Sequence, residues 1–266
     1  MKRWLDKWNS YKYRFVPWIT FNLKNRTVRE VPNASEDNII PENTLQQLLL
    51  GVITALNENE AKHDTNKHNT QDTALEVMNK VLGYKTQRKP SLLSGGGEGL
   101  FVTQGVVPRG SLVALYPGTV YWPYEPIFFQ SIANHFVFRC IDGLLIDGND
   151  RGISKSIFRS SGLRDQLGPY VPCDLSWLDG TFHNPLAVGQ YANNASKRHP
   201  ANVAYQELDI VIKTVPINLL KYIPNVWYGA DNIGRDNAFI RTVALVSTRE
   251  INEGEEVLSS YFTVIH

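Results

Sequence analysis

The chain has 266 residues, of which 42% are hydrophobic, 11% aromatic and 20% charged. This profile indicates one large globular domain, or a domain with a small appendage, and excludes a disordered chain. Lysine and arginine number 27 against 26 aspartate and glutamate, so the net charge of +1 excludes the strongly positive coat typical of proteins that bind nucleic acid stably.

The N-terminal segment combines aromatic and basic character. Five aromatic residues recur there at steps of three and four: Trp4, Trp8, Tyr11, Phe15 and Trp18. This spacing predicts an amphipathic helix that ends or kinks at Pro17. Residues 1–30 contain eight basic and two acidic residues. We expect the aromatic stripe to pack on the rest of the protein. The alternatives are a helix that binds a partner, nucleic acid or a membrane surface, and a mitochondrial transit peptide.

Two further helices are predicted in the N-terminal region, which we take to span residues 1–83. The first covers 41–56, with leucine, isoleucine and valine on one face, and the second covers 73–82 and stops at Gly83. The polar stretch 57–70 between them is expected to be a structureless linker. Its His63 and His68 have no third ligand nearby, so no metal site is expected. Residues 84–94 are expected to be a connector.

From residue 95 to 266 the sequence favours a second unit made of short strands. Apolar runs bounded by glycine, proline, asparagine or aspartate predict strands at 100–103, 112–115, 136–141, 144–146, 203–212 and 242–247. Asp142-Gly143 predicts a tight hairpin between two of them. Residues 216–223 could form a short helix, and 148–189 is expected to be an insertion. The fold class is therefore α+β, mostly β.

Membrane and secretory signals are weak. The longest nearly apolar run, Leu48 to Leu56, is about half a membrane span, and the segment after Met1 lacks the apolar core of a secretory signal. Cys140 and Cys173 alone cannot build a disulfide framework or a four-cysteine zinc site. We expect an intracellular protein of the nucleus and/or cytoplasm, with mitochondria as a weaker alternative.

The glycine-rich stretch 95–99 is not a phosphate-binding loop. Such a loop follows a strand and opens a helix, whereas these glycines precede the apolar run 100–103. What remains is a glycine turn whose backbone can approach a ligand closely. Serine-hydrolase and zinc-protease signatures are absent from the sequence.

Three motifs in a fixed order carry the strongest signal. They are Gly97-Glu98-Gly99-Leu100-Phe101 with the turn Pro108-Arg109-Gly110; Gln190-Tyr191-Ala192-Asn193-Asn194-Ala195 with Pro200-Ala201-Asn202; and Gly254-Glu255-Glu256-Val257 followed by Tyr261. Together they resemble the SET domain of protein lysine methyltransferases, over about residues 95–262. The segments 11–18, 124–131 and 145–150 resemble one animal member of this family, so the similarity covers nearly the whole chain.

The resemblance implies a SET-type fold of short curled sheets with a β-clip-like core, and S-adenosylmethionine as cofactor. It implies a protein substrate with an accessible lysine, whose amine takes up the methyl group. It also implies roles for individual residues: Tyr261 as the catalytic tyrosine, also near the cofactor; Gly97, Glu98, Gly99, Asn193 and Asn194 as cofactor-binding residues; and Tyr116 and Ser259 as walls of the lysine channel.

Two departures from the family pattern leave an alternative open. Asn194 stands where the family has histidine, and Ser259 stands where an aromatic residue is usual. A SET scaffold with weak or no catalysis, acting as a protein-interaction module through its N-terminal segment, would also fit these residues.

Overall fold

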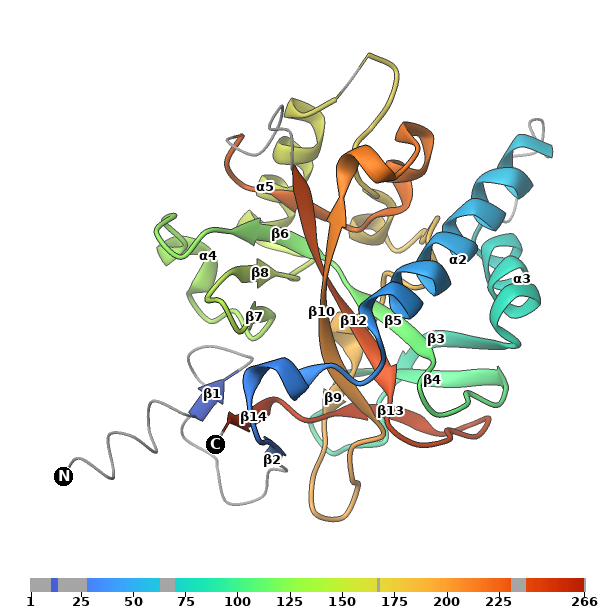
Figure 1. Cartoon of the computed structure of the whole chain (residues 1–266), viewed down its shortest axis with the longest axis vertical. Helices are drawn as coiled ribbons and strands as arrows, with labels where there is room; N and C mark the ends of the chain where they lie inside the picture. The colour runs from blue at the N-terminus through green and yellow to red at the C-terminus, as the bar shows by residue number, and fades with distance from the viewer. Residues whose placement is uncertain (1–10, 14–27, 63–69, 167, 231–237, 266) are drawn as a thin grey trace.

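The computed structural model describes residues 11–13, 28–62, 70–166, 168–230 and 238–265. Three sheets and several helices organise this part of the chain (Figure 1). A short helix, η3 (Ala34–Asp37), precedes the long helices α2 (Glu42–Lys62) and α3 (Thr70–Leu82), which contact each other. None of the described helices is long and apolar enough to span a membrane.

Helix α2 buries the predicted apolar face, which consists of Leu45, Leu49, Val52, Ile53 and Leu56. It contacts α3, strands β5 (Leu112–Tyr116) and β10 (Val203–Val211) of the central sheet, and helix η7 (Ile217–Tyr222), so it belongs to the same hydrophobic core as that sheet. The helix continues to Lys62, so the predicted linker is helical over residues 57–62, and α3 already begins at Thr70. Glutamate, alanine and lysine near the end of α2 favour helix, and Glu60 is held by contacts with η7. Residues 63–69 lie outside the described part.

The central sheet has the strand order β3-β4-β13-β10-β12-β5. Its strands are β3 (Tyr84–Pro90), β4 (Glu98–Gly105), β5 (Leu112–Tyr116), β10 (Val203–Val211), β12 (Phe239–Ser247) and β13 (Glu256–Ser259), and β9 (Asn193–Asn194) pairs with β13 at one side. The predicted strands at 100–103, 112–115, 203–212 and 242–247 are confirmed. The expected connector 84–94 instead contains β3, which pairs antiparallel with β4.

A four-stranded sheet has the order β11-β6-β8-β7. It contains β6 (Gly118–Tyr121), β7 (Val137–Arg139), β8 (Leu145–Asp147) and β11 (Asn225–Trp227). The predicted hairpin is confirmed, because β7 and β8 pair antiparallel and the Cys140 N–H donates to the Leu144 carbonyl at 2.8 Å. Gly143 has a φ of 95°, a conformation that glycine adopts without strain.

The third sheet joins segments from both ends of the chain. Strand β14 (Phe262–Ile265) lies between β1 (Tyr11–Tyr13) and β2 (Val28–Val31). The helix predicted over residues 4–18 is therefore wrong at 11–13, because pairing with β14 outweighs the helical spacing of the aromatic residues. The other residues of that prediction lie outside the described part.

The remaining helices lie between these strands in the chain. They are α4 (Phe128–Ser131), α5 (Gly152–Arg164), η4 (Ser176–Asp179), η5 (Gly189–Tyr191), η6 (Ile212–Thr214) and η7 (Ile217–Tyr222). The last confirms the short helix expected at 216–223.

The position of β13 assembles the three sequence motifs. Glu256 and Val257 pair antiparallel with Phe101 and Leu100 of β4. On the other side, Leu258 and Ser259 pair in parallel with β9. Three segments that are far apart in the sequence therefore meet around one short strand.

Candidate functional site

A cavity of about 610 Å³ opens where these three segments meet. It is lined by the glycine turn, the loop after β8 and the two motifs near the C-terminus: Leu93, Ser94, Gly95, Gly96, Gly97, Glu98, His135, Phe136, Asp150, Arg151, Gln190, Tyr191, Asn193, Asn194 and Tyr261. The size is in the range of pockets for small organic ligands.

The glycine turn presents its backbone to this cavity. Gly95 and Gly97 have φ angles of 78° and 60°, and a side chain at either position would strain the turn. At Gly96 a Cβ atom would lie 2.5 Å from Ser91 Oγ. The Ser91 N–H donates to the Gly97 carbonyl at 2.8 Å, which closes the turn. A Cβ at Gly99 would lie 2.4 Å from Glu256 Oε1, so this glycine allows β4 and β13 to approach.

Glu256 ties the turn to the rest of the site. Its side chain is buried, and its carboxylate accepts hydrogen bonds from Ser91 Oγ at 2.6 Å and from the Leu92 N–H at 3.0 Å. The Asn193 amide group donates to the same carboxylate at 3.1 Å and to the Glu98 carbonyl at 2.9 Å. Asn193 therefore fixes the turn beside the cavity.

Asn202, the last residue of the second motif, binds the backbone of β13 with its side chain. The Asn202 side chain donates to the Glu256 carbonyl at 2.8 Å and accepts from the Leu258 N–H at 2.8 Å. Asn202 is 1% exposed, and these two bonds give both polar atoms of its amide a partner inside the protein. This asparagine acts on the strand and does not line the cavity.

Tyr261 follows β13 and projects into the cavity. Its hydroxyl donates a hydrogen bond to the Ala192 carbonyl at 3.2 Å, and its N–H donates to Asn194 Oδ1 at 3.3 Å. The ring is half-buried. Asn194 therefore contacts both the cavity and the tyrosine that the sequence marked as catalytic.

The two predicted channel residues do not line the cavity. Tyr116 and Ser259 are fully buried and are not among the lining residues. The Tyr116 hydroxyl donates to the Phe136 carbonyl at 2.8 Å. Burial, followed by the nearby Tyr205, Tyr261 and Asp147, raises the pKa of Tyr116 well above its ordinary value, so its hydroxyl stays protonated.

Tyr205 is an aromatic residue that the sequence reasoning missed. Its hydroxyl lies 2.7 Å from Ser259 Oγ, and its ring centroid lies 5.0 Å from that of Phe138 and 6.3 Å from that of Tyr116. A ring from β10 thus packs against the serine that replaces the family's usual aromatic. Only the register of β10 against β13, Val203 opposite Ser259, brings them together.

Comparison with known proteins shows the family. No protein-family model matches the chain. A human protein, SET domain-containing protein 9, is 44% identical, and the match covers 98% of this chain and 96% of the human protein. The protein of the same name from Pongo abelii is 42% identical, with 90% of this chain and 97% of that protein covered.

The chain belongs to the SET domain-containing protein 9 family. The expected SET-type fold is thereby confirmed, together with an α+β architecture of short, curled sheets. Among solved structures, CpSET8 from Cryptosporidium matches with 13% identity and a TM-score of 0.34, covering 98% of this chain and 90% of that one. A similarity this weak carries no argument about the site.

This SET domain also contains a pocket residue that the motif reading did not single out. Gln190 lines the cavity and is 5% exposed, and neither polar atom of its carboxamide has a hydrogen-bond partner among the described residues. A buried amide left in this state costs free energy, which a polar ligand would recover. Gln190 is the first residue of the second motif, so its position in the sequence could have identified it as a site residue.

Its neighbour Tyr191 belongs to a polar group at the edge of the cavity. The Tyr191 hydroxyl accepts from an Arg88 N–H at 3.0 Å and donates to Asp150 Oδ2 at 2.9 Å. Burial, together with the charge and hydrogen bond of Asp150, raises the pKa of Tyr191 to about 12. Asp150 and Arg151 form an ion pair at 3.6 Å, so this side of the cavity carries both signs of charge.

A cluster of possible metal ligands in the SET domain has another explanation. Ligand atoms of Cys140, Asp142 and Glu207 lie within 4.8 Å of one another. Arg241 forms ion pairs of 3.0 Å with both Asp142 and Glu207. The guanidinium therefore already occupies these carboxylates as their ion-pair partner, and burial raises the pKa of the Cys140 thiol, which disfavours the thiolate that a metal needs.

Proposed function

We propose that this SET domain transfers a methyl group from S-adenosylmethionine to the lysine amine of a protein substrate. One observation carries the proposal. Gly97, Glu98, Asn193, Asn194 and Tyr261, which the motifs assign to cofactor binding and catalysis, line one cavity of about 610 Å³. They come from three segments that only the fold unites.

The chemistry of the cavity fits the amino-acid end of this cofactor, which carries a carboxylate and an ammonium group. The open backbone of the glycine turn, where a Cβ at Gly95 or Gly97 would meet nothing within 4 Å, leaves space beside peptide groups. The unpaired carboxamide of Gln190 offers a donor and an acceptor. The Asp150 carboxylate at the edge suits an ammonium group.

When bound, S-adenosylmethionine would supply a methyl group on a positively charged sulfur, to which a neutral amine can bond while the sulfur keeps the electron pair of the broken bond. The protein must therefore disfavour the ammonium form of lysine. The aromatic residues Phe136, Tyr191 and Tyr261 line the cavity, and their apolar surface would disfavour the ammonium form there.

Tyr261 would orient the reacting groups. Because its proton is engaged with the Ala192 carbonyl, the lone pairs of its oxygen remain available to an electropositive group in the cavity. The hydrogen bond from its backbone to Asn194 holds it in place. Catalysis would then depend on alignment and on oxygens preorganised around the methyl group.

The experiment combines cofactor binding with methyl transfer. Isothermal titration of S-adenosylmethionine into the full chain should give a micromolar Kd, and Gln190→Leu should weaken it by about tenfold or more. Labelled cofactor and a library of lysine peptides should then show transfer that Tyr261→Phe reduces by at least about a hundredfold. Tyr124→Phe, at a residue that is 73% exposed and away from the cavity, is the matched control and should keep full activity.

Two results would contradict the proposal. A well-folded chain that gives neither heat nor a thermal shift with millimolar S-adenosylmethionine has no working cofactor site. Binding without transfer to any lysine peptide or to denatured total protein would leave a cofactor-binding scaffold in place of an enzyme.

A further inference from the structure

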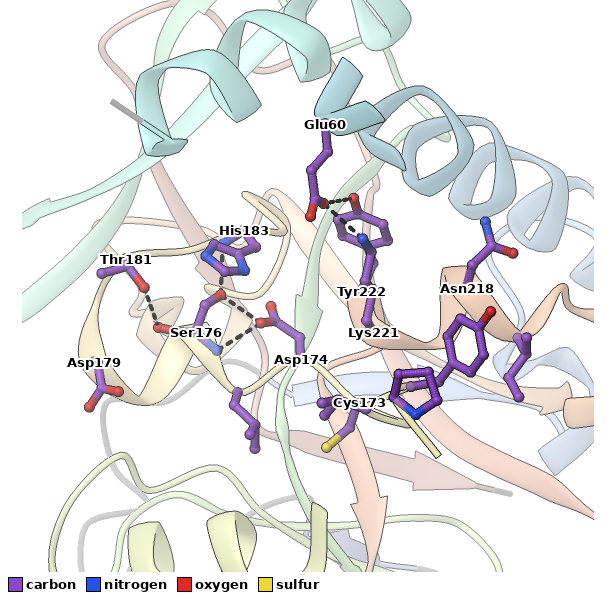
Figure 2. Close-up of a pocket in the computed structure, with 15 residues that line it drawn as sticks. Glu60, Cys173, Asp174, Ser176, Asp179, Thr181, His183, Asn218, Lys221 and Tyr222 are labelled. Carbon is purple, nitrogen blue, oxygen red and sulfur yellow. Dashed lines mark hydrogen bonds and ion pairs between the residues drawn. The ribbon is translucent and has the colours of Figure 1, made fainter. Parts of the chain in front are cut away.

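A second cavity, of about 540 Å³, lies between the end of α2, the segment around η4 and helix η7 (Figure 2). No described residue lines both this cavity and the proposed cofactor site. The motifs and the proposed function make no use of it.

Asp174 provides the feature of this cavity that needs explanation. It is 1% exposed, and its Oδ1 accepts hydrogen bonds from the Ser176 N–H at 2.8 Å and from Ser176 Oγ at 2.6 Å. Its other oxygen, Oδ2, has no hydrogen-bond partner among the described residues. Figure 2 shows this carboxylate directed toward the space between His183 and Glu60. A buried carboxylate oxygen without a donor is costly, so a ligand that donates to it gains affinity.

The carboxylate can meet such a ligand by a small change in its orientation. The terminal torsion of aspartate is broad, and a small rotation moves both oxygens together, so Oδ2 can gain a donor while the bonds from Ser176 to Oδ1 adjust. Burial raises the pKa of Asp174, and the hydrogen bonds from Ser176, the nearby His183 and the backbone of Asn184 oppose this effect. A cation beside Oδ2 would favour the charged form.

The other acidic residues on the lining are already paired. Glu60 accepts from Lys221 Nζ at 2.9 Å and from the Tyr222 hydroxyl at 2.5 Å. Asp179 pairs with Lys155 at 2.7 Å and with Arg159 at 2.9 Å. The positive charges of Lys221, Lys155 and Arg159 therefore balance these two carboxylates, and Asp174 Oδ2 is the carboxylate oxygen on the lining that has no donor among the described residues.

The cavity also has apolar surface. Tyr170 and Ile217 line it and are 45% and 41% exposed, so both side chains offer apolar surface to a ligand. Val171 and Pro169 extend the same surface. A ligand with one charged end and an apolar body would cover both features.

We propose that this cavity binds an organic cation, an ammonium or guanidinium group on an apolar arm. The cation donates to Asp174 Oδ2, and the arm packs on Tyr170 and Ile217. A metal ion does not fit as well, because the described histidine, cysteine and carboxylate side chains that lie close enough to share an ion form a different group, around Cys140.

The first test compares two probes of the same shape. Isothermal titration of the full chain with 2-phenylethylamine and with 2-phenylethanol separates the charge from the apolar arm. The amine should bind at least about tenfold more tightly than the alcohol. Equal affinities, or no binding of the amine up to about 10 mM, would overturn the proposal.

The second test locates the probe. Asp174→Asn keeps an oxygen for Ser176 and removes a charge that burial disfavours, so this variant should fold; a thermal unfolding curve checks that it does. It should weaken the amine by at least about tenfold while leaving the alcohol unchanged. Asp179→Asn, which lines the same cavity but is already paired, is the control and should change the Kd of the amine less than about twofold. If both variants lose the amine equally, the cation is held by general negative potential, and the assignment to Asp174 is wrong.

Discussion

The backbone N–H of Tyr261 donates a hydrogen bond to the side-chain Oδ1 of Asn194 over 3.3 Å. Asn194 occupies the position where the SET resemblance implies a histidine. The amide of Asn194 retains an acceptor oxygen, and this oxygen accepts from Tyr261, the residue that the motifs mark as catalytic. The substitution therefore leaves a contact to Tyr261, and four predictions follow from this and neighbouring contacts.

Asn194→Ala should lower kcat by about tenfold, because the Tyr261 backbone loses its acceptor and the ring loses its fixed position. Stability should fall by about 1 kcal/mol, the usual net contribution of one hydrogen bond. Asn194→Asp, which keeps the acceptor, should recover part of the lost kcat. Steady-state kinetics of the three proteins test this, and an alanine variant with unchanged kcat would show that Asn194 does not position Tyr261.

Glu256→Ala should be strongly destabilising, because it leaves donors of Ser91, Leu92 and Asn193 without their shared acceptor. We expect a loss of about 3 kcal/mol in the free energy of unfolding, measured by urea titration, and weaker cofactor binding. Glu253→Ala removes an exposed carboxylate that accepts one bond from Gly105. As the matched control, it should cost less than about 1 kcal/mol. Similar losses in both variants would refute the special role of Glu256.

The pair Tyr205 and Ser259 should be energetically coupled. Tyr205→Phe and Ser259→Ala each leave a buried hydroxyl without this partner, whereas the double variant removes both. A double-mutant cycle on unfolding free energies should therefore give a coupling of about 1 kcal/mol. Additive losses would mean that the two hydroxyls contribute independently, and that the tyrosine packs beside the serine without depending on it.

The ion pair between Glu255 and Arg249 gives a pH-dependent prediction. The hydrogen bond from Arg249 holds the pKa of Glu255 at about 2, below its ordinary value of 4.5. A lowered carboxyl pKa stabilises the fold above pH 4.5, and this contribution disappears as the pH falls through about 2.

Arg249→Ala should raise the pKa of Glu255 toward 4.5, which a carbon-detected NMR titration measures directly. Because both side chains are partly exposed, the accompanying change in stability at pH 7 should stay below about 1 kcal/mol. An unchanged Glu255 pKa in this variant would show that the hydrogen bonds from Asn252 alone are responsible.

Local signals predicted much of the fold. Turn residues and apolar runs located most strands of the central sheet, and Asp142-Gly143 located a hairpin, because each depends on a few neighbouring residues. The helix predicted in the N-terminal segment was wrong because the structure there depends on a distant part of the chain. Its aromatic spacing favours a helix, but Tyr11–Tyr13 pairs with a strand at the far end of the chain, and no local pattern contains that information.

The candidate site, like the fold, was predictable only in part. The motifs named five residues that line the cavity, since family resemblance reports on them directly. The family resemblance could not predict that Tyr205 contacts Ser259, because this contact depends on strand register. It also could not predict that Asp174 is buried with one oxygen unpaired among the described residues. For the N-terminal segment, partner binding stays a prediction, as do the protein substrate and the cellular compartment.

The third sheet has a consequence for how the protein is made. Strand β14, which directly follows Tyr261, needs β1 on one side and β2 on the other. The ribosome delivers those two strands first and their shared partner only after more than 200 intervening residues. Until then, both carry unpaired edges that invite contact with other chains. Tyr261, which we propose as the catalytic residue, thus takes its place in one of the last steps of folding. A nascent chain stalled before it would hold a nearly complete core with unpaired strand edges exposed.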